Sequence, residues 1–293
     1  MPRFVSRPMR IVSHPADIFN ICRALLAPVL FFLPFGVGFL GDHPFAYFIA
    51  LFALIGDTNY VLHLHIHHPF TKLRGLNLAL DLCMGAVTGV TASNWRIQHL
   101  YGHHAGKDHA FRARPRRELE RYSVRNAISF SLRSIWPTFV GPIVEAFDKG
   151  VLAAVKSPID YRWAFAEQSL SIALVAALCA WRPALVVVYV LPWYALTCFN
   201  SRYVDYLNHY GCDESSANRF ECSNNSLNIW FNRLTNNFGY HTAHHLRPGA
   251  HWTELPRIHR RIADRIPRHC LKPFSWSISQ LPYHFYLSSR GRM

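Results

Sequence analysis

The sequence has few acidic residues and no recognisable fingerprint of an organic redox cofactor. Asp and Glu together number 17 against 31 Lys and Arg, so the 293-residue chain carries a formal net charge of +14. Its seven cysteines include no CxxC pair, which leaves a zinc ribbon or a thiol redox motif without support. No flavin or nicotinamide fingerprint occurs. Redox chemistry in this chain would therefore need another cofactor and an outside source of electrons.

Charged residues make up only 16% of the chain, while hydrophobic residues make up 51%. This composition fits neither a disordered nor a highly soluble polypeptide. Four apolar runs, at about 18–40, 45–64, 164–181 and 184–205, approach the roughly 20 residues that a helix needs to cross a bilayer. Short links join the runs in pairs, so we expect two transmembrane hairpins. A shorter stretch from Leu76 is expected to lie along the interface or to dip into the membrane without crossing it.

Positive charge is distributed unevenly among the segments that these spans would separate. Residues 1–23 hold four Lys or Arg, residues 63–162 hold fourteen, and the chain after residue 200 holds twelve. The link between the last two spans holds only Arg182. Lysine and arginine accumulate in loops that stay in the cytosol, so we expect both termini and the central segment to be cytoplasmic. A soluble helical protein with buried helices is the alternative.

Eighteen histidines are present; ten of them fall in three short windows, and eight of these ten are at a spacing suited to metal ligands. The windows read HLHIHH at 63–68, HLYGHH at 99–104 and HTAHH at 241–245. Residues three or four positions apart on a helix point the same way, so each window can direct imidazoles at one metal ion. The expected topology puts all three windows on the cytosolic side. The candidate ligands are His63, His67, His99, His103, His104, His241, His244 and His245.

Imidazole is a ligand that suits iron, copper, nickel and zinc. Eight imidazoles are more than one tetrahedral zinc ion needs. Two ions that lean toward octahedral coordination and keep positions open would use them, which favours a di-iron centre. A non-catalytic membrane metal carrier is an alternative, although transport ligands should lie within the spans near the bilayer midplane. A zinc-dependent membrane hydrolase is a third possibility.

The three windows, split by a hydrophobic hairpin, resemble the membrane-bound fatty acid desaturase and hydroxylase superfamily from about Asn59 to Arg257. The stretch YHTAHHLRP with a following Leu-Pro step is similar to desaturases, whereas HLYGHH and LNHYG at 207–211 are similar to the alkane hydroxylase branch. The resemblance implies a di-iron site that uses O2, and His209 as a further metal ligand. It also implies an external electron donor of the ferredoxin, rubredoxin or cytochrome b5 type.

Several positions depart from the superfamily patterns. Leu64 stands where hydroxylases usually carry an acidic residue, which also removes an HExxH zinc-protease interpretation. His68 makes the register of the first window ambiguous, because His63 could pair with either His67 or His68; we prefer His67. Ala243 and Arg247 replace residues that are commonly acidic and aromatic in desaturases, so contacts to substrate or partner there are expected to differ.

Four polar residues near the windows are candidates for supporting the metal ligands. Asp57 and Asn59 lie near the end of the second expected span, where an intramembrane carboxylate is a functional suspect. Asn208 could orient His209 or bind iron through water, and Asp108 could hydrogen-bond an imidazole of the second window. For Asp57, Asn59 and Asn208 the alternative is ordinary contact with interfacial water.

We therefore predict an all-α integral membrane protein with one domain over residues 1–293. It has four transmembrane helices in two hairpins and a cytosolic histidine-rich helical layer formed by residues 63–162 and 206–260. The predicted reaction is oxidation of an unactivated C–H bond in a lipid acyl chain, with two Fe2+ ions and O2. Fatty acid desaturation is preferred, and hydroxylation of an alkane or fatty acid is the alternative.

The densest run of positive charge, RARPRRELERYSVR at 112–125, is predicted to meet a negatively charged partner. Anionic lipid headgroups are one partner that fits such a run. An acidic electron carrier is the other. Binding to nucleic acid is not expected, because it would need a soluble basic face and no spans.

Overall fold

The computed structural model describes residues 11–37, 44–55, 58–104, 122–147, 161–212 and 217–272. Within these ranges the chain is helical, and the only strand-like pairings are isolated bridges between Val12 and Thr71 and between Asn225 and Leu271. The predicted all-α class is therefore confirmed for the described residues.

Three helical segments are long and apolar enough to cross a membrane, namely Pro15–Val37, Arg162–Trp181 and Pro183–His209. They contain α1 (Ile18–Val37), α10 (Tyr161–Trp181), and α11 (Pro183–Leu185) with η3 (Val186–Val190) and α12 (Leu191–His209). Large apolar side chains such as Phe165, Ile172 and Val187 are exposed on them. Contiguous exposed apolar surface of this kind fits contact with lipid.

The second expected span, 45–64, is described as two helices, α2 (Pro44–Ile55) and α3 (Thr58–His67). Asp57 lies between them, outside the described residues. The stretch from Leu76 forms α4 (Arg74–Thr88), which is followed at an angle of 89° by α5 (Ala92–Trp95) and the π-helix η2 (Arg96–His103). This bent pair passes the same test as one broken span or a re-entrant loop, so the described part has three or four candidate spans.

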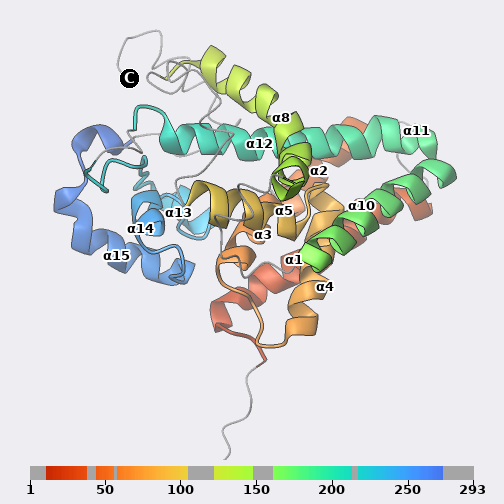
Figure 1. The fold of residues 1–293 in the computed structure, drawn as a ribbon, viewed down its shortest axis with the longest axis horizontal. Coiled ribbons are helices and arrows are strands. Elements are labelled where there is room, and N and C mark those ends of the chain that lie inside the picture. Colours follow the sequence, from red (N-terminus) through yellow and green to blue (C-terminus); the bar gives the residue numbers. More distant parts are fainter. Residues whose placement is uncertain are drawn as a thin grey trace, which may run out of the picture.

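A 24-residue helix, α8 (Val124–Phe147), occupies a region to which the sequence analysis assigns no separate element. It packs along α12, where Phe130 contacts Tyr206 in a shared aromatic cluster. In Figure 1 α12 runs along the upper side of the molecule, and α8 crosses it and leans outward. This position gives α12 a helical neighbour next to the residues that lead to His209.

Aromatic residues hold the apolar helices together. Phe31 of α1 stacks on Tyr189 of η3 with ring centroids 5.2 Å apart, and the Tyr189 hydroxyl donates to the Phe31 carbonyl at 2.8 Å. The Trp193 indole donates to the carbonyl of Val87 in α4 at 3.0 Å. A hydrogen bond within such a core satisfies the polar tip of a ring whose body is buried.

Glu167 interrupts the apolar sequence of α10, and the structure gives the reason. Its side chain is buried, and its two carboxylate oxygens accept from the backbone N–H groups of Ala92 and Ser93 at 3.0 and 3.1 Å. These N–H groups begin α5, where a helix has unsatisfied donors and a positive dipole end. The carboxylate of one candidate span thus caps the helix that leads into η2.

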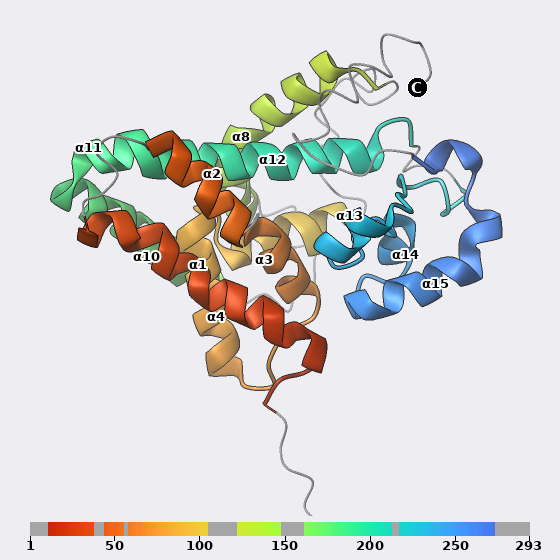
Figure 2. The same ribbon diagram turned by 180° about the vertical axis from the view of Figure 1, so that it is seen from behind.

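The chain after α12 forms short helices at one end of the molecule. They are α13 (Ile229–Leu234), α14 (His241–Leu246), η4 (Trp252–Glu254), α15 (Leu255–Ile262), η5 (Ala263–Arg265) and η6 (Arg268–Cys270). Figure 2 shows this group at the opposite end of α12 from α11, beside α3 and the start of α1. The predicted histidine-rich helical region is thereby present at one end of the apolar helices.

Candidate metal centre

Nine histidines from four separate parts of the chain meet at this end. Their side chains come from α3, from η2 and the residue that follows it, from the last residue of α12, and from α14. Eight of them form two groups of four in which the ligand atoms all lie within 4.8 Å of one another. The first group is His63, His67, His99 and His244, and the second group is His103, His209, His241 and His245.

The first group is compact. The Nε2 atoms of His63 and His99 are 2.8 Å apart. His104 joins it from the side, because its Nε2 lies 3.1 Å from the Nε2 of His99 and 3.1 Å from that of His244. The His104 ring also lies 4.8 Å from the ring of His245, so this residue stands between the two groups.

The second group repeats the arrangement. The Nε2 of His245 lies 3.2 Å from the Nε2 of His103 and 3.2 Å from that of His241. The Nε2 of His241 is in turn 3.2 Å from the Nε2 of His209. The nine histidines proposed from the sequence are therefore brought together, with His209 at the same distance as the others.

Hydrogen bonds between the imidazoles cannot account for all of the close Nε2–Nε2 contacts in the two groups. A neutral imidazole has one N–H donor and one acceptor nitrogen, yet Nε2 of His99, His104, His241 and His245 each faces two other Nε2 atoms. The Nδ1 of His209 lies 3.2 Å from the Cys222 carbonyl, which accepts a hydrogen bond from it and leaves a lone pair on Nε2. Lone pairs that converge in this way fit a cation within each group.

The spacing also bears on the geometry of coordination. Two imidazole nitrogens that bind one ion at about 2.1 Å are roughly 3.0 Å apart at a right angle and roughly 3.4 Å apart at the tetrahedral angle. The observed Nε2 separations run from 2.8 to 3.2 Å. These are the closest pairs, and all ligand atoms of a group lie within 4.8 Å of one another, a spacing at which one ion could be shared.

Burial keeps these imidazoles in the neutral form that binds metal. Burial, with some repulsion from His209, lowers the pKa of His104 to about 4. Burial and the neighbouring histidines lower the pKa of His241, His244 and His245 well below the usual value for histidine. Metal ligands must be deprotonated, so the site is ready to bind a cation at neutral pH without first losing protons.

The π-helix η2 explains how one window serves both groups. The His104 N–H donates to the His99 carbonyl five residues earlier, at 2.9 Å, rather than to the carbonyl four residues earlier. Such wide turns are rare and often occur at functional sites. Here the turn lets His99 enter the first group and His103 the second, while His104 reaches His99 again through its side chain.

A polar loop before α13 fixes the third window, and the sequence analysis does not anticipate it. Asn225 accepts from the backbone N–H of Thr242 at 3.0 Å and donates to the Thr242 hydroxyl at 2.7 Å. The Gly239 N–H donates to the Asn232 side chain at 3.0 Å. These contacts hold the start of α14, and Cys222 in the same loop holds His209.

The residues proposed as supports for the ligands have different positions. Asn59 is buried, and its side-chain oxygen accepts from the Trp95 indole at 3.1 Å, next to His63 and His99. Asn208 lines a different pocket, with Asn224 and Asn225, and the group that holds His209 Nδ1 is the Cys222 carbonyl. Asp57 and Asp108 lie outside the described residues.

His67 and His68 separate clearly in space. His67 belongs to the first group, whereas His68 lies with Asp17 and His251 in a third set of neighbouring ligand atoms, which we call the Asp17 group. His251 Nε2 lies 3.0 and 3.1 Å from the Asp17 carboxylate oxygens, and the Trp252 indole donates to the same carboxylate at 2.9 Å. His65 points elsewhere, accepting from the Phe70 N–H at 3.2 Å.

Two pockets reach the first group from different sides. One has about 320 Å³ of open space and is lined by His63 and His99 together with Asn59, Trp95, Val204 and Phe238. The other has about 390 Å³ and joins His63, His67 and His244 to the Asp17 group, with Phe70 and Leu255 in its wall. Two recesses thus adjoin the first group.

The sequence model of the fatty acid desaturase family matches residues 42–277, most of the chain and every histidine of the two groups. The chain belongs to the fatty acid desaturase family. No curated protein matches it. As a member of this family the chain is expected to be an oxidoreductase that acts on lipid in a membrane, and its clustered histidines fit the metal chemistry of that family.

Proposed function

We propose that this protein catalyses the O2-dependent desaturation of a lipid acyl chain at a di-iron centre held by the first and second groups and His104. The observation that carries the proposal is the pair of four-histidine groups, whose Nε2 atoms face one another at 2.8 to 3.2 Å. An unactivated C–H bond does not react with an acid, a base or a nucleophile. Iron, when bound, would supply together with O2 the oxidising power that this bond requires.

The residues of the chain bind and orient the metal and exclude water. Nine imidazoles would supply the ligands. The four histidines of the first group and His104 would surround one ion, and the four histidines of the second group would surround the other. The Cys222 carbonyl fixes the tautomer of His209, and such supporting contacts set the orientation of a ligand ring. His63, His99 and His241 are each less than a tenth exposed, which keeps bulk water away from the centre.

The 320 Å³ pocket offers a place for the carbon to be oxidised. Its wall combines the apolar side chains of Trp95, Val204 and Phe238 with polar ones such as Ser201 and Asp205, and it ends at His63 and His99. It lies between α3, α5 and α12, of which α12 is part of a candidate span. An acyl chain that lies along the apolar helices could enter it and bring one methylene to the metal centre.

Electrons must come from a separate protein of the ferredoxin, rubredoxin or cytochrome b5 type. Residues 112–121 of the basic run proposed to dock such a carrier lie outside the described residues. A second basic surface is present on α15 and the turns after it, where Arg257, Arg260, Arg261, Arg265 and Arg268 are exposed. Helix α15 packs on α14 through Leu255 and Ile258, so an acidic carrier bound there would lie close to three of the ligands. This surface and both termini would face the cytosol.

Hydroxylation of an alkane or fatty acid is the second candidate. The observation in its favour is His209, which stands in the LNHYG stretch similar to alkane hydroxylases and lies 3.2 Å from His241. Desaturation removes two hydrogens and gives an alkene, whereas hydroxylation inserts oxygen and gives an alcohol. Mass spectrometry of the products from cells fed a deuterated acyl chain separates the two.

Functions outside this chemistry predict different behaviour. A metal carrier would bind iron without consuming O2 in the presence of lipid and a reductant. A zinc-dependent hydrolase would be active with zinc and would need neither O2 nor reductant. Both are tested by purified protein loaded with iron or with zinc, with O2 uptake and product formation as the readouts.

The decisive experiment is expression in a host that lacks the product, with comparison of lipid profiles between wild type and His244→Ala. We expect a new unsaturated or hydroxylated lipid with the wild type and none with the variant. His269→Ala is the matched control, because His269 is exposed and belongs to neither group. An identical profile for wild type and His244→Ala would refute the proposal.

A further inference from the structure

Helix α12 carries an arginine that is buried beside the candidate metal centre. Arg202 is 7% exposed and lies in the candidate span Pro183–His209, seven residues before His209 and therefore on nearly the same face. A charge inside a span is costly, and its partners indicate its role.

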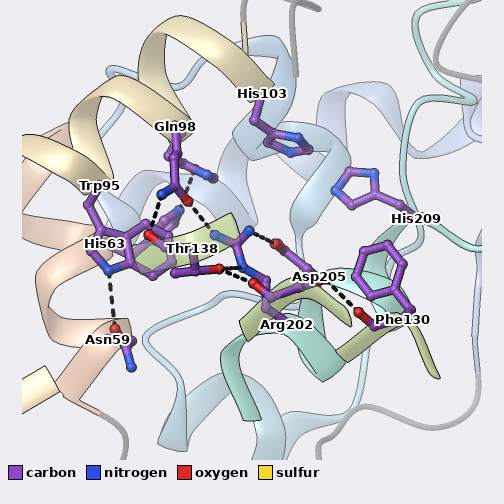
Figure 3. Close-up of polar contacts among 12 residues, drawn as sticks. Asn59, His63, Trp95, Gln98, His103, Phe130, Thr138, Arg202, Asp205 and His209 are labelled. Carbon is purple, nitrogen blue, oxygen red and sulfur yellow. Dashed lines mark hydrogen bonds and ion pairs between the residues drawn. The ribbon is translucent and has the colours of Figure 1, made fainter. Parts of the chain in front are cut away.

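The guanidinium of Arg202 joins three helices. Its Nη1 donates to Asp205 at 2.8 Å, its Nε donates to the Thr138 hydroxyl of α8 at 2.8 Å, and its Nη2 donates to the side chain of Gln98 in η2. Gln98 in turn donates to the Thr138 carbonyl at 2.8 Å. The planar fork of arginine can serve all three directions at once, which lysine cannot do. Figure 3 shows this network below His103 and His209.

Two partners of Arg202 lie on η2 and α12, which carry two candidate ligands of the second group, His103 and His209, and one of the first, His99. Gln98 directly precedes His99 and lies on η2 together with His103. Asp205 lies one turn before His209 on α12. The rings of His103, on η2, and His209, on α12, are 4.7 Å apart. The distance between these two rings therefore depends on how η2 and α12 are held together.

We propose that Arg202 is a positioning residue for the second group, holding Gln98 and Asp205 so that His103 and His209 converge on one ion. This rests on the proposed function only in that the second group binds a metal. The second group takes both His103 from η2 and His209 from α12, whereas the first group takes only His99 from these two elements and its other members from α3 and α14. Loss of Arg202 therefore acts mainly on the ion of the second group.

The test is iron binding by purified, reconstituted protein. Wild type, Arg202→Gln and Arg202→Lys are loaded with 57Fe2+, and iron per chain is measured together with the Mössbauer spectrum. We expect two iron sites in the wild type. In Arg202→Gln we expect one of them to bind roughly tenfold more weakly, as is typical when a residue that orients a ligand is lost. Arg202→Lys should show the same selective loss, because lysine restores the charge but not the three contacts.

Arg96→Gln is the matched control. Arg96 is also on η2, and it forms a two-contact ion pair with the buried Asp81 at 2.9 and 3.0 Å, without contact to Gln98 or Asp205. We expect both iron sites to stay as in the wild type. The melting temperature of each variant, measured without iron, shows whether its helical core is intact.

Three outcomes would overturn the inference. Equal affinities in wild type and Arg202→Gln would show that the network does not position ligands. Full recovery in Arg202→Lys, or the same loss in Arg96→Gln, would show that charge or general packing is responsible. If the wild type binds no iron, the proposed function fails together with the inference, whereas two bound irons with unchanged variants would refute the inference alone.

Discussion

The molecule contains two places where imidazoles gather, and they differ in what satisfies them. In the first and second groups, within the described residues, every candidate ligand is a histidine, and Nε2 atoms face one another. In the Asp17 group, a buried carboxylate accepts from Trp252 and lies 3.0 Å from His251. In the Asp17 group a carboxylate thus faces His251, whereas the first and second groups offer only imidazole nitrogens.

This difference separates a site that needs a ligand from a contact that stabilises the fold. Asp17 precedes α1 and His251 precedes α15, 234 residues later, so their pairing fastens the start of the chain to the third histidine window. A buried charge with hydrogen-bonded partners is satisfied without an ion. Among the described residues, the first and second groups include no carboxylate, and a cation is the group that would complete them.

The largest expected effect comes from removing one imidazole in each place. His245→Ala should lower product formation by at least about 100-fold and reduce bound iron, because it deletes a ligand of the second group. His251→Ala should keep iron per chain and product formation near the wild-type values. The measurements are product yield by mass spectrometry and iron by elemental analysis. Equal losses in both variants would mean that the two places are not functionally distinct.

Removal of iron should destabilise the protein substantially. A ligand present at 1,000 times its dissociation constant stabilises the folded state by about 4 kcal/mol, which corresponds to a shift of roughly 10 °C for a chain of this size. The melting temperature in detergent, with iron or after chelation, is the measurement. In His245→Ala the shift should shrink, and an undiminished shift in that variant would contradict the assignment of the second group.

Asp17→Asn should change stability and leave metal binding alone. The substitution weakens charge-assisted contacts to His251 and Trp252, at a cost of about 2 kcal/mol in the free energy of unfolding. The iron-dependent shift in melting temperature should equal that of the wild type, because the Asp17 carboxylate contacts His251 and Trp252 rather than a ligand of the first or second group. A loss of bound iron in Asp17→Asn would instead make the Asp17 group part of the metal centre.

Two glycines around the third window give the finest comparison. A Cβ at Gly239 would lie 2.3 Å from the Ser226 carbonyl oxygen and 2.7 Å from the Asn232 side chain, whereas a Cβ at Gly249 would meet nothing within 4 Å. Gly239→Ala should therefore cost about 2 kcal/mol of stability, and Gly249→Ala less than about 0.5 kcal/mol. Urea or thermal unfolding measures both. Similar losses of stability in the two variants would show that the loop at Ser226 can move to accommodate the added Cβ.

The sequence predicted the convergence of the histidines better than it predicted their surroundings. Spacing along a helix brings neighbours such as His241 and His245 together, and this information is local. The pairing of Asp17 with His251 and the contacts of Arg202 with Gln98 depend on packing between distant segments, which no periodicity encodes. The π-turn that brings His99 and His104 together also differs from the regular helix on which the spacing argument relies.

For the fold, too, local sequence patterns predicted some elements, whereas features that depend on contacts between distant segments were missed. Apolar runs predicted α1, α10 and α12 because hydrophobicity is summed over about 20 residues. Helix α8 was not predicted, because polar residues are interspersed along it. In the structure, Ser131, Ser134 and Thr138 are buried and donate to backbone carbonyls four residues earlier. In the sequence, Glu167 only interrupts an apolar run. Its role as a helix cap depends on the position of α5 beside α10, which the sequence does not reveal.

The wide turn of η2 makes the chain length between its histidines critical. In a regular α-helix each residue turns the direction of the side chain by about 100°, so residues five positions apart point about 140° away from each other. One residue more or fewer between His99 and His103 would thus swing the rest of the segment to another side of the helix. Substitutions at Leu100 or Tyr101 leave this count unchanged, whereas a single-codon deletion there should abolish metal binding.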